Sequence, residues 1–291
     1  SGTYSGIGAL VSQNAETGII TVVKAFADAP AAKAGVKNGD IIYKVKGKEV
    51  TGVDINNVVT EMKGEKGTTV DITVYRESEK KYIDFTITRD QVNEPTVEYK
   101  MLDKKKKIGY IQISQFEEVT YDQFTKALDD LKKQGMKAVI FDVRSNPGGL
   151  YETVCKMLDE ILPEGNLVST KDKYGNEEKQ TSDSKCLDMP MVVLQNKDSA
   201  SASEIFAGAI QDFNAGKIVG TQSFGKGIVQ TILPLSDGSA VKLTVQDYYT
   251  PSGKNIHGKG ITPDVEAELE ENATSDTQLE KAKETIMELM K

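Results

Sequence analysis

The sequence predicts a mixed protein, of α/β and α+β class, that is built from two domains. Residues 1–92 are expected to form a small β-barrel with two helices, and residues 93–291 a layered α/β core with antiparallel strands near its C-terminus. Short β-branched runs separated by glycine turns predict the first domain. Apolar strands that alternate with amphipathic helices predict the second.

The first domain contains five short runs that are rich in β-branched and aromatic residues. The predicted strands are Ile7–Val11, Ile19–Val23, Ile41–Val45, Thr69–Tyr75 and Tyr82–Ile87. Helices are predicted over Ala29–Ala34 and Asp54–Lys63, between these strands. In the second helix Val58, Val59 and Met62 form an apolar stripe at helical spacing, which gives the helix one face for the core.

The second domain alternates strands and helices. Its predicted core strands are Ile108–Ile113, Ala138–Val143, Met189–Gln195 and Lys217–Thr221. Its predicted helices are Tyr121–Gln134, Leu150–Leu162, Ser201–Phe213 and Asp276–Lys291. Two further runs, Val229–Leu233 and Ser239–Thr250, indicate an antiparallel pair.

Composition excludes several classes of function. The net charge is −8, from 36 basic and 44 acidic residues, whereas nucleic-acid binding requires a basic face. With two cysteines, Cys155 and Cys186, and one histidine, His257, the chain offers no ligand spacing for zinc or another metal, and no cofactor motif is complete. No apolar run reaches the length that spans a bilayer.

Acyl transfer in this chain needs a base other than histidine. His257 lies in a polar, turn-like stretch and is predicted to be a solvated loop residue. A lysine can act as the base when burial favours its neutral amine. Lys226 is the best candidate, because it lies between two glycines with apolar Phe224 and Ile228 beyond them. A lysine in a surface turn is the alternative interpretation.

Three serines where a strand passes into a helix are candidate nucleophiles: Ser199, Ser201 and Ser203. The free N–H groups of a helix's first turn could hold an oxyanion there. Ser201 with Glu204 also matches a capping box, which requires no catalysis, and the residues alone do not choose among the serines. The Gly148-Gly149 turn after a second strand offers bare N–H groups as another oxyanion donor.

Segments of the first domain resemble a PDZ domain of the bacterial, circularly permuted type. They are Ser5-Gly6-Ile7-Gly8, Ala29–Gly35 and Asn38–Ile42. The resemblance implies a carboxylate-binding loop at Gly6, Ile7 and Gly8. It also implies a groove between the strand that holds Ala9 and Leu10 and the helix that holds Val58 and Met62. A substrate peptide with a free C-terminus would pair there as an added strand.

The second domain is similar to the carboxyl-terminal processing peptidases, also called tail-specific proteases. The matching segments are Asp142–Gly149, Ser199–Asp212, Gly220–Gln230, Tyr249–Ile256 and Gly260–Asp264. Membership implies Ser201 as nucleophile, Lys226 as general base 25 residues later, and Gln230 as the group that orients the lysine. The oxyanion hole is implied to use the N–H of Ala202 and that of Gly148 or Gly149. Glu204, Asp212 and Ser223 fall on motif positions in supporting roles.

The resemblance also implies the setting of the activity. We expect a serine endopeptidase that acts near the C-termini of proteins or peptides, without metal, cofactor or nucleic acid. An extracytoplasmic location is expected, reached through a leader or anchor outside this sequence, and homo-oligomers could form through segments outside it. Two alternatives are a PDZ scaffold that binds peptides without cutting them and a hydrolase of small amides or esters.

Overall fold

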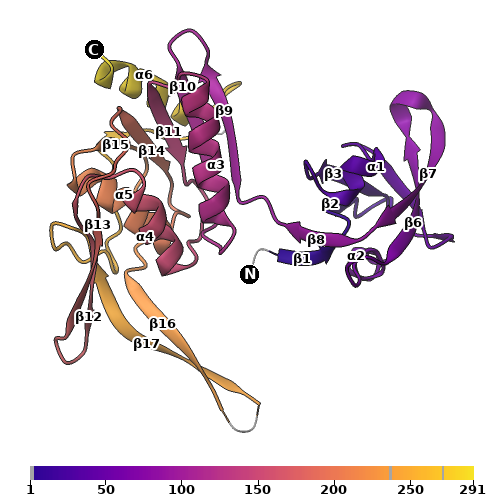
Figure 1. The fold of residues 1–291 in the computed structure, drawn as a ribbon, viewed down its shortest axis with the longest axis horizontal. Coiled ribbons are helices and arrows are strands. Elements are labelled where there is room, and N and C mark those ends of the chain that lie inside the picture. Colours follow the sequence, from indigo (N-terminus) through magenta and orange to yellow (C-terminus); the bar gives the residue numbers. More distant parts are fainter. Residues whose placement is uncertain (1–2, 236–237, 271) are drawn as a thin grey trace. The chain divides into compact units, whose positions relative to one another are not determined.

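A computed structural model describes residues 3–235, 238–270 and 272–291. The chain forms two compact units, Ser1–Pro95 and Thr96–Lys291 (Figure 1). This division falls close to the boundary after residue 92 that the sequence predicts. No described helix is long and apolar enough to cross a membrane.

The first unit is an antiparallel sheet with two short helices. Its strands are β1 (Thr3–Gly6), β2 (Ala9–Gln13), β3 (Ile20–Ala25), β4 (Ile41–Val45), β5 (Lys48–Glu49), β6 (Thr69–Arg76), β7 (Lys81–Thr88) and β8 (Asp90–Asn93). The helices are α1 (Pro30–Ala34) and α2 (Ile55–Met62), with a 3-10 turn at Glu77–Glu79. All seven predicted elements are present, within a few residues at their ends.

The sheet of the first unit has the strand order β2-β3-β4-β6-β7, and β1 pairs separately with β8. Strand β2 therefore lies at an edge of the sheet. An edge strand presents unpaired backbone groups to which a further strand can be added. Inside the sheet, the buried Arg76 guanidinium donates to both carboxylate oxygens of Asp40 at 2.8 Å, and to the carbonyl oxygen of Gly35 after α1.

The second unit contains two sheets and four helices. Its strands are β9 (Val97–Asp103), β10 (Ile108–Ile113), β11 (Ala138–Asp142), β12 (Gly165–Asp172), β13 (Glu177–Ser182), β14 (Met191–Gln195), β15 (Gly216–Gly220), β16 (Ile228–Pro234), β17 (Ala240–Tyr249) and β18 (Val265–Glu266). Its helices are α3 (Thr120–Lys133), α4 (Tyr151–Asp159), α5 (Ala202–Asp212) and α6 (Thr277–Leu289). The predicted core strands, helices and antiparallel pair are confirmed, and β9, β12, β13 and β18 are additional.

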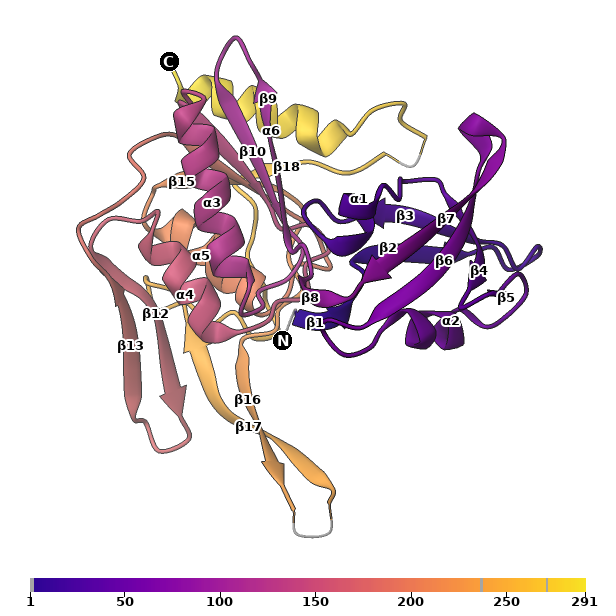
Figure 2. The same ribbon diagram turned by 45° about the vertical axis from the view of Figure 1, so that its right-hand side comes forward.

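The main sheet of this unit separates two helical layers (Figure 2). Its order is β18-β15-β14-β11-β10-β9, in which only β9 runs antiparallel to its neighbour. Alternate side chains of β11 point to opposite faces. Val139 and Phe141 pack in the cluster formed with α3, α4 and α5, whereas Ala138 and Ile140 pack with α6. The layered α/β core predicted from the sequence is therefore confirmed.

Parallel order brings the carboxyl ends of β11, β14 and β15 to one edge of the sheet. The segments that follow these strands are 143–150, 196–201 and 221–227. In open α/β sheets the ends of such strands are where functional sites form. The second sheet, in the order β13-β12-β17-β16, continues from the third of these segments. Both ribbon views show β16 and β17 projecting from the body of the unit (Figures 1 and 2).

Candidate active site

A cavity of about 370 Å³ lies where the three segments meet the start of β16. Five of the residues that the sequence singles out line it: Gly149, Ser201, Ala202, Lys226 and Gln230. These residues come from three separate loops, helix α5 and strand β16, so the fold rather than the chain order brings them together. Gly148 does not line the cavity, although its neighbour does.

Of the three candidate serines, only Ser201 lines the cavity. Ser199 and Ser203 are both buried, and their hydroxyls donate to the carbonyl oxygens of Val143 at 2.8 Å and Asn146 at 2.9 Å. Those two hydroxyls therefore hold neighbouring loops together. Ser201 is half-buried, with its side chain available at the cavity.

The backbone of Ser201 is strained. Its φ of 58° and ψ of −115° lie in a region that L-residues rarely adopt, at the residue immediately before α5. Strain of this kind costs about 1–3 kcal/mol and persists where surrounding structure enforces it. Here the conformation places a hydroxyl at the positive end of a helix dipole, where developing negative charge is favoured.

The Glu204 carboxylate helps to hold Ser201 in this strained conformation. It is fully buried and accepts four hydrogen bonds. One oxygen accepts from the N–H of Ser201 at 2.9 Å and the N–H of Lys226 at 2.8 Å. The other accepts from Ser223 Oγ and the N–H of Gly225, both at 2.6 Å. The expected capping box is present at Ser201, but the carboxylate also joins the loops of both candidate catalytic residues.

The predicted oxyanion donors lie against the serine. A Cβ added at Gly148 would lie 2.8 Å from Ser201 Cβ and 3.0 Å from Ala202 N, which shows how closely the two loops approach. The Gly148 N–H is already donated to Asn146 Oδ1 at 2.8 Å. Within the described parts of the chain, the N–H of Gly149 donates to no partner. The geometry therefore favours Gly149 over Gly148 as the second donor.

Lys226 is half-buried at the cavity wall. Its backbone is fixed at both ends: its N–H donates to Glu204, and its carbonyl oxygen accepts from the Tyr248 hydroxyl. Phe224, which the sequence suggested as apolar cover for the amine, is 65% exposed, so that part of the expectation is wrong. Among the described residues no hydrogen bond joins Lys226 Nζ to Ser201 Oγ.

Gln230 lines the same cavity but is not bonded to the lysine. Its Nε2 donates to Thr244 Oγ1 at 3.4 Å, across the β16–β17 pair. The role of Gln230 in orienting Lys226 stays a prediction. His257 is exposed, as expected of a loop residue.

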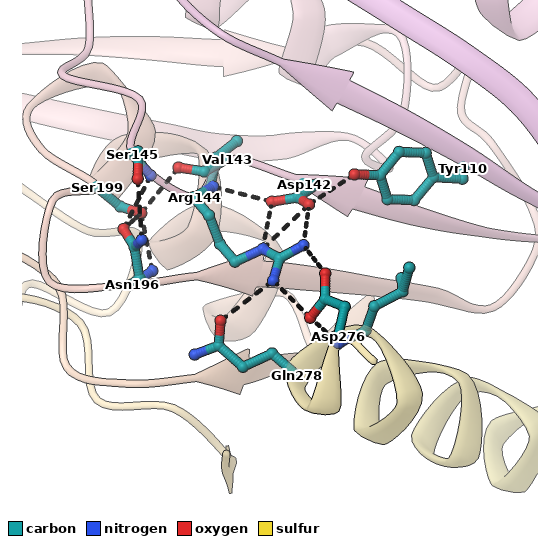
Figure 3. Close-up of polar contacts among 10 residues, drawn as sticks. Tyr110, Asp142, Val143, Arg144, Ser145, Asn196, Ser199, Asp276 and Gln278 are labelled. Atoms are coloured by element: carbon teal, nitrogen blue, oxygen red, sulfur yellow. Dashed lines mark hydrogen bonds and ion pairs between the residues drawn. The ribbon is translucent and has the colours of Figure 1, made fainter. Parts of the chain in front are cut away.

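An ion-pair network fixes the start of the glycine loop, the segment 143–150 that follows β11 (Figure 3). At the end of β11, buried Asp142 accepts from the Arg144 guanidinium at 2.7 Å and from Tyr110 Oη at 2.7 Å. Arg144 also donates to both oxygens of Asp276, the residue that caps α6. Burial and the Asp142 charge raise the pKa of Tyr110 well above its usual value, which keeps the phenol a neutral donor.

A second set of contacts in Figure 3 joins the glycine loop to the serine loop, the segment 196–201 that follows β14. The Ser145 N–H donates to Asn196 Oδ1 at 2.8 Å, and Asn196 Nδ2 donates to Ser145 Oγ at 3.0 Å. Buried Asn146 continues the link, because its carbonyl oxygen accepts from the Ala200 N–H at 3.0 Å. The predicted oxyanion donors and Ser201 are thus held by one network of hydrogen bonds.

The predicted peptide-binding residues of the first unit lie in several environments. Gly8 has a φ of 75°, and a Cβ there would lie 2.3 Å from that of Ala29, so the loop requires glycine. Ala9 and Leu10 lie on edge strand β2, with Leu10 50% exposed. Gly6 and Ile7 are buried, as are Val58 and Met62 of α2, and the last two pack in the core of the unit with Ile7. The peptide-binding role of this set stays a prediction.

Sequence reasoning gave no role to Tyr248, which lines the cavity. Tyr248 is 1% exposed, on β17, and its side chain lines the cavity beside Ser201 and Lys226. Its position falls within a predicted strand, but tyrosines are common in strands and carry no signal of their own. Only the pairing of β17 with β12 and β16 brings it to the site.

Comparison with known proteins agrees with this geometry. Residues 107–267 match the model of peptidase family S41, and residues 5–87 match that of the PDZ domain. The chain is 41% identical over 275 residues to a carboxy-terminal-processing protease of Bartonella bacilliformis, covering 92% of this chain and 62% of that protein. It is 40% identical over 269 residues to a probable CtpA-like serine protease of Staphylococcus epidermidis, covering 91% and 53%.

Among solved structures, the photosystem II D1 C-terminal processing protease is similar at a TM-score of 0.57 and 30% identity. The match covers 94% of this chain and 75% of that one. The chain spans 53–62% of the length of the two curated relatives named above. Nearly the whole chain takes part in each match, and the cavity lies within the matched peptidase region. The chain therefore belongs to peptidase family S41 and carries a PDZ domain before its peptidase core.

Proposed function

We propose that this protein is a serine endopeptidase that cleaves protein substrates near their C-termini, with Ser201 as nucleophile and Lys226 as general base. The observation that carries the proposal is the single cavity that both side chains line, with Ser201 held in a strained conformation at the start of α5. The names of the similar proteins, which describe C-terminal processing, support the substrate class.

The proposed reaction proceeds through an acyl-enzyme. Neutral Lys226 takes the Ser201 proton, the serine oxygen bonds to the scissile carbonyl carbon, and the carbonyl oxygen becomes an oxyanion. The N–H groups of Ala202 and Gly149 stabilise that charge; losing one such donor costs about 3–4 kcal/mol in barrier. Lys226 then returns the proton to the leaving amine, and water releases the acyl group.

A rotation of side chains within the cavity completes this arrangement. The Lys226 backbone is already anchored on Glu204, so only its flexible side chain must swing to reach Ser201 Oγ. Gln230 can then turn from Thr244 to accept from the lysine amine. Catalytic hydrogen bonds are often longer without substrate than in the substrate complex. Substrate is therefore expected to favour the arrangement in which the Lys226 amine contacts both Ser201 Oγ and Gln230.

The PDZ domain is proposed to bind the substrate's C-terminal tail. Strand β2 has a free edge on its sheet, which supports binding of an extended peptide as an added strand. Gly8 adopts a positive φ and has no side chain, so no side chain at this position obstructs the approach of the terminal carboxylate to the loop. Exposed Leu10 offers an apolar contact to a tail side chain.

Cleavage of a peptide with a free C-terminus tests the proposal. A fluorogenic peptide is compared with the same peptide amidated at its C-terminus and with a small ester, each against the Ser201→Ala and Lys226→Ala variants. We expect cleavage of the free peptide, slower cleavage of the amidated one, and loss of activity in both variants. Binding without cleavage would support a scaffold instead, and cleavage of the ester alone a small-molecule hydrolase.

A further inference from the structure

Tyr248 lines the same cavity as the two proposed catalytic residues, Ser201 and Lys226. Its hydroxyl donates to the carbonyl oxygen of Lys226. The Tyr248 N–H donates to the carbonyl oxygen of Gly227 at 3.0 Å. One residue of the cavity wall thus holds the main chain of the proposed base through two hydrogen bonds.

Packing alone does not explain a tyrosine at this position. The ring is almost fully buried in the core cluster of the second unit, where phenylalanine would fill the same space. A hydroxyl taken out of water is costly unless it is paired. Its partner here is the carbonyl oxygen of Lys226, a residue of the cavity wall, rather than a group remote from the cavity.

The phenol remains protonated in this environment. Burial and the nearby Glu204 carboxylate raise the pKa of Tyr248 well above its usual value. The neutral phenol donates its proton to the Lys226 carbonyl oxygen. Tyr248 is therefore a hydrogen-bond donor to the loop that carries Lys226 and is not a competing base.

We propose that Tyr248 is a positioning residue of the peptidase reaction, which fixes the Lys226 backbone at the cavity wall so that the lysine amine can reach the Ser201 hydroxyl. The inference rests on the proposed function. During attack the Ser201 proton passes to the Lys226 amine as the serine oxygen bonds to the carbonyl carbon. Tyr248 keeps its own proton and its hydrogen bond to the Lys226 carbonyl oxygen throughout.

Tyr248→Phe tests this role because it removes the hydroxyl and keeps the ring. Tyr249→Phe is the matched control: the next residue of β17 points to the opposite face of its strand, where its ring stacks with Lys171. For each variant kcat and KM are measured with the free-C-terminus peptide. The rate of Ser201 labelling by a fluorophosphonate and the Tm are measured beside them.

We expect Tyr248→Phe to lower kcat and the labelling rate about 10- to 100-fold, because loss of the hydrogen bond lets the Lys226 backbone shift and a misplacement of about 1 Å costs about 100-fold in rate. KM and Tm should stay close to those of the wild type, and Tyr249→Phe should match the wild type throughout. A purely structural role would lower Tm and leave the activity of the folded fraction unchanged.

Three results would overturn the inference: a Tyr248→Phe variant with wild-type kcat, an equal loss in Tyr249→Phe, or a loss of kcat that only follows a loss of Tm. In each of these cases a wild-type protein that cleaves and labels at Ser201 leaves the proposed function intact. A wild-type protein that neither cleaves nor labels would instead remove the proposed function, and this inference with it.

Discussion

Replacing Glu204 by glutamine perturbs the site at the point where its two loops are joined. The carboxylate accepts from the N–H groups of Ser201, Lys226 and Gly225 and from Ser223 Oγ, at 2.6–2.9 Å. All four partners are donors, which an ionised carboxylate satisfies. A glutamine side chain keeps one acceptor oxygen and turns an NH₂ group toward the other two donors, which then have no partner.

The energetic cost of this substitution follows from the two hydrogen bonds that it breaks. A hydrogen bond to a charged group contributes about 1.5–3 kcal/mol, so breaking two should lower the free energy of unfolding by about 3–6 kcal/mol. That is a large part of the roughly 5–15 kcal/mol typical of a folded protein. A shift of about 1 Å in either loop would also slow acylation by about 100-fold.

Urea unfolding followed by far-UV circular dichroism measures the stability, since the chain has no tryptophan for fluorescence. Fluorophosphonate labelling measures the acylation rate at low urea. Glu152→Gln is the control, because Glu152 also lies in the first turn of a helix but is exposed. The Glu152→Gln variant measures how much stability is lost when a negative charge is removed from the start of a helix, which is about 1 kcal/mol or less. A Glu204→Gln variant no less stable than Glu152→Gln would refute the assigned role of the carboxylate.

Three other predictions concern the loops around the site. Gly148→Ala should abolish labelling with the fold retained, because φ is 106° and the new Cβ would lie 2.8 Å from that of Ser201; labelling near the wild-type rate would contradict this. Burial raises the pKa of Asp276, but the hydrogen bond and charge of Arg144 and the N–H groups of Leu279 and Gln278 together outweigh burial, and the net pKa is lowered. The stabilisation by ionised Asp276 is therefore complete above the unfolded pKa of about 4 and is lost as the pH falls through the lowered pKa, so Asp276→Asn should lower Tm more at pH 7 than at pH 2. Burial raises the pKa of Cys155 to about 12, so a thiol reagent at pH 8 should modify exposed Cys186 first, which peptide mass spectrometry checks.

The predicted strands and helices follow from side-chain periodicity, which the structure explains. Strand β11 is apolar from Ala138 to Phe141 because helices cover both faces of its sheet, and the amphipathic terminal segment forms α6 on one of those faces. The polar strand β13 (Glu177–Ser182) was missed because it is an edge strand whose residues are mostly exposed. Its pairing with β12 depends on tertiary structure, and no local pattern encodes that.

The candidate site could be predicted only in part. The order and spacing of motifs predicted Ser201 and Lys226, and the structure shows why Ser199 and Ser203 are less suitable: their buried hydroxyls donate to carbonyl groups. The four hydrogen bonds of Glu204 could not be anticipated, because a capping box explains a glutamate at that position equally well. Tyr248 reaches the cavity through strand pairing with residues almost 80 positions earlier, Thr170 among them, which a sequence pattern does not reveal.

The most direct test of the central claim is the site of covalent modification by a fluorophosphonate. Intact mass should rise by one adduct, and peptide mapping should place that adduct on Ser201. Lys226→Ala should remain folded and lose the adduct, since without the base the serine is a weak nucleophile. An adduct on another serine, or labelling of Lys226→Ala at the wild-type rate, would contradict the assignment of Ser201 and Lys226 as nucleophile and base.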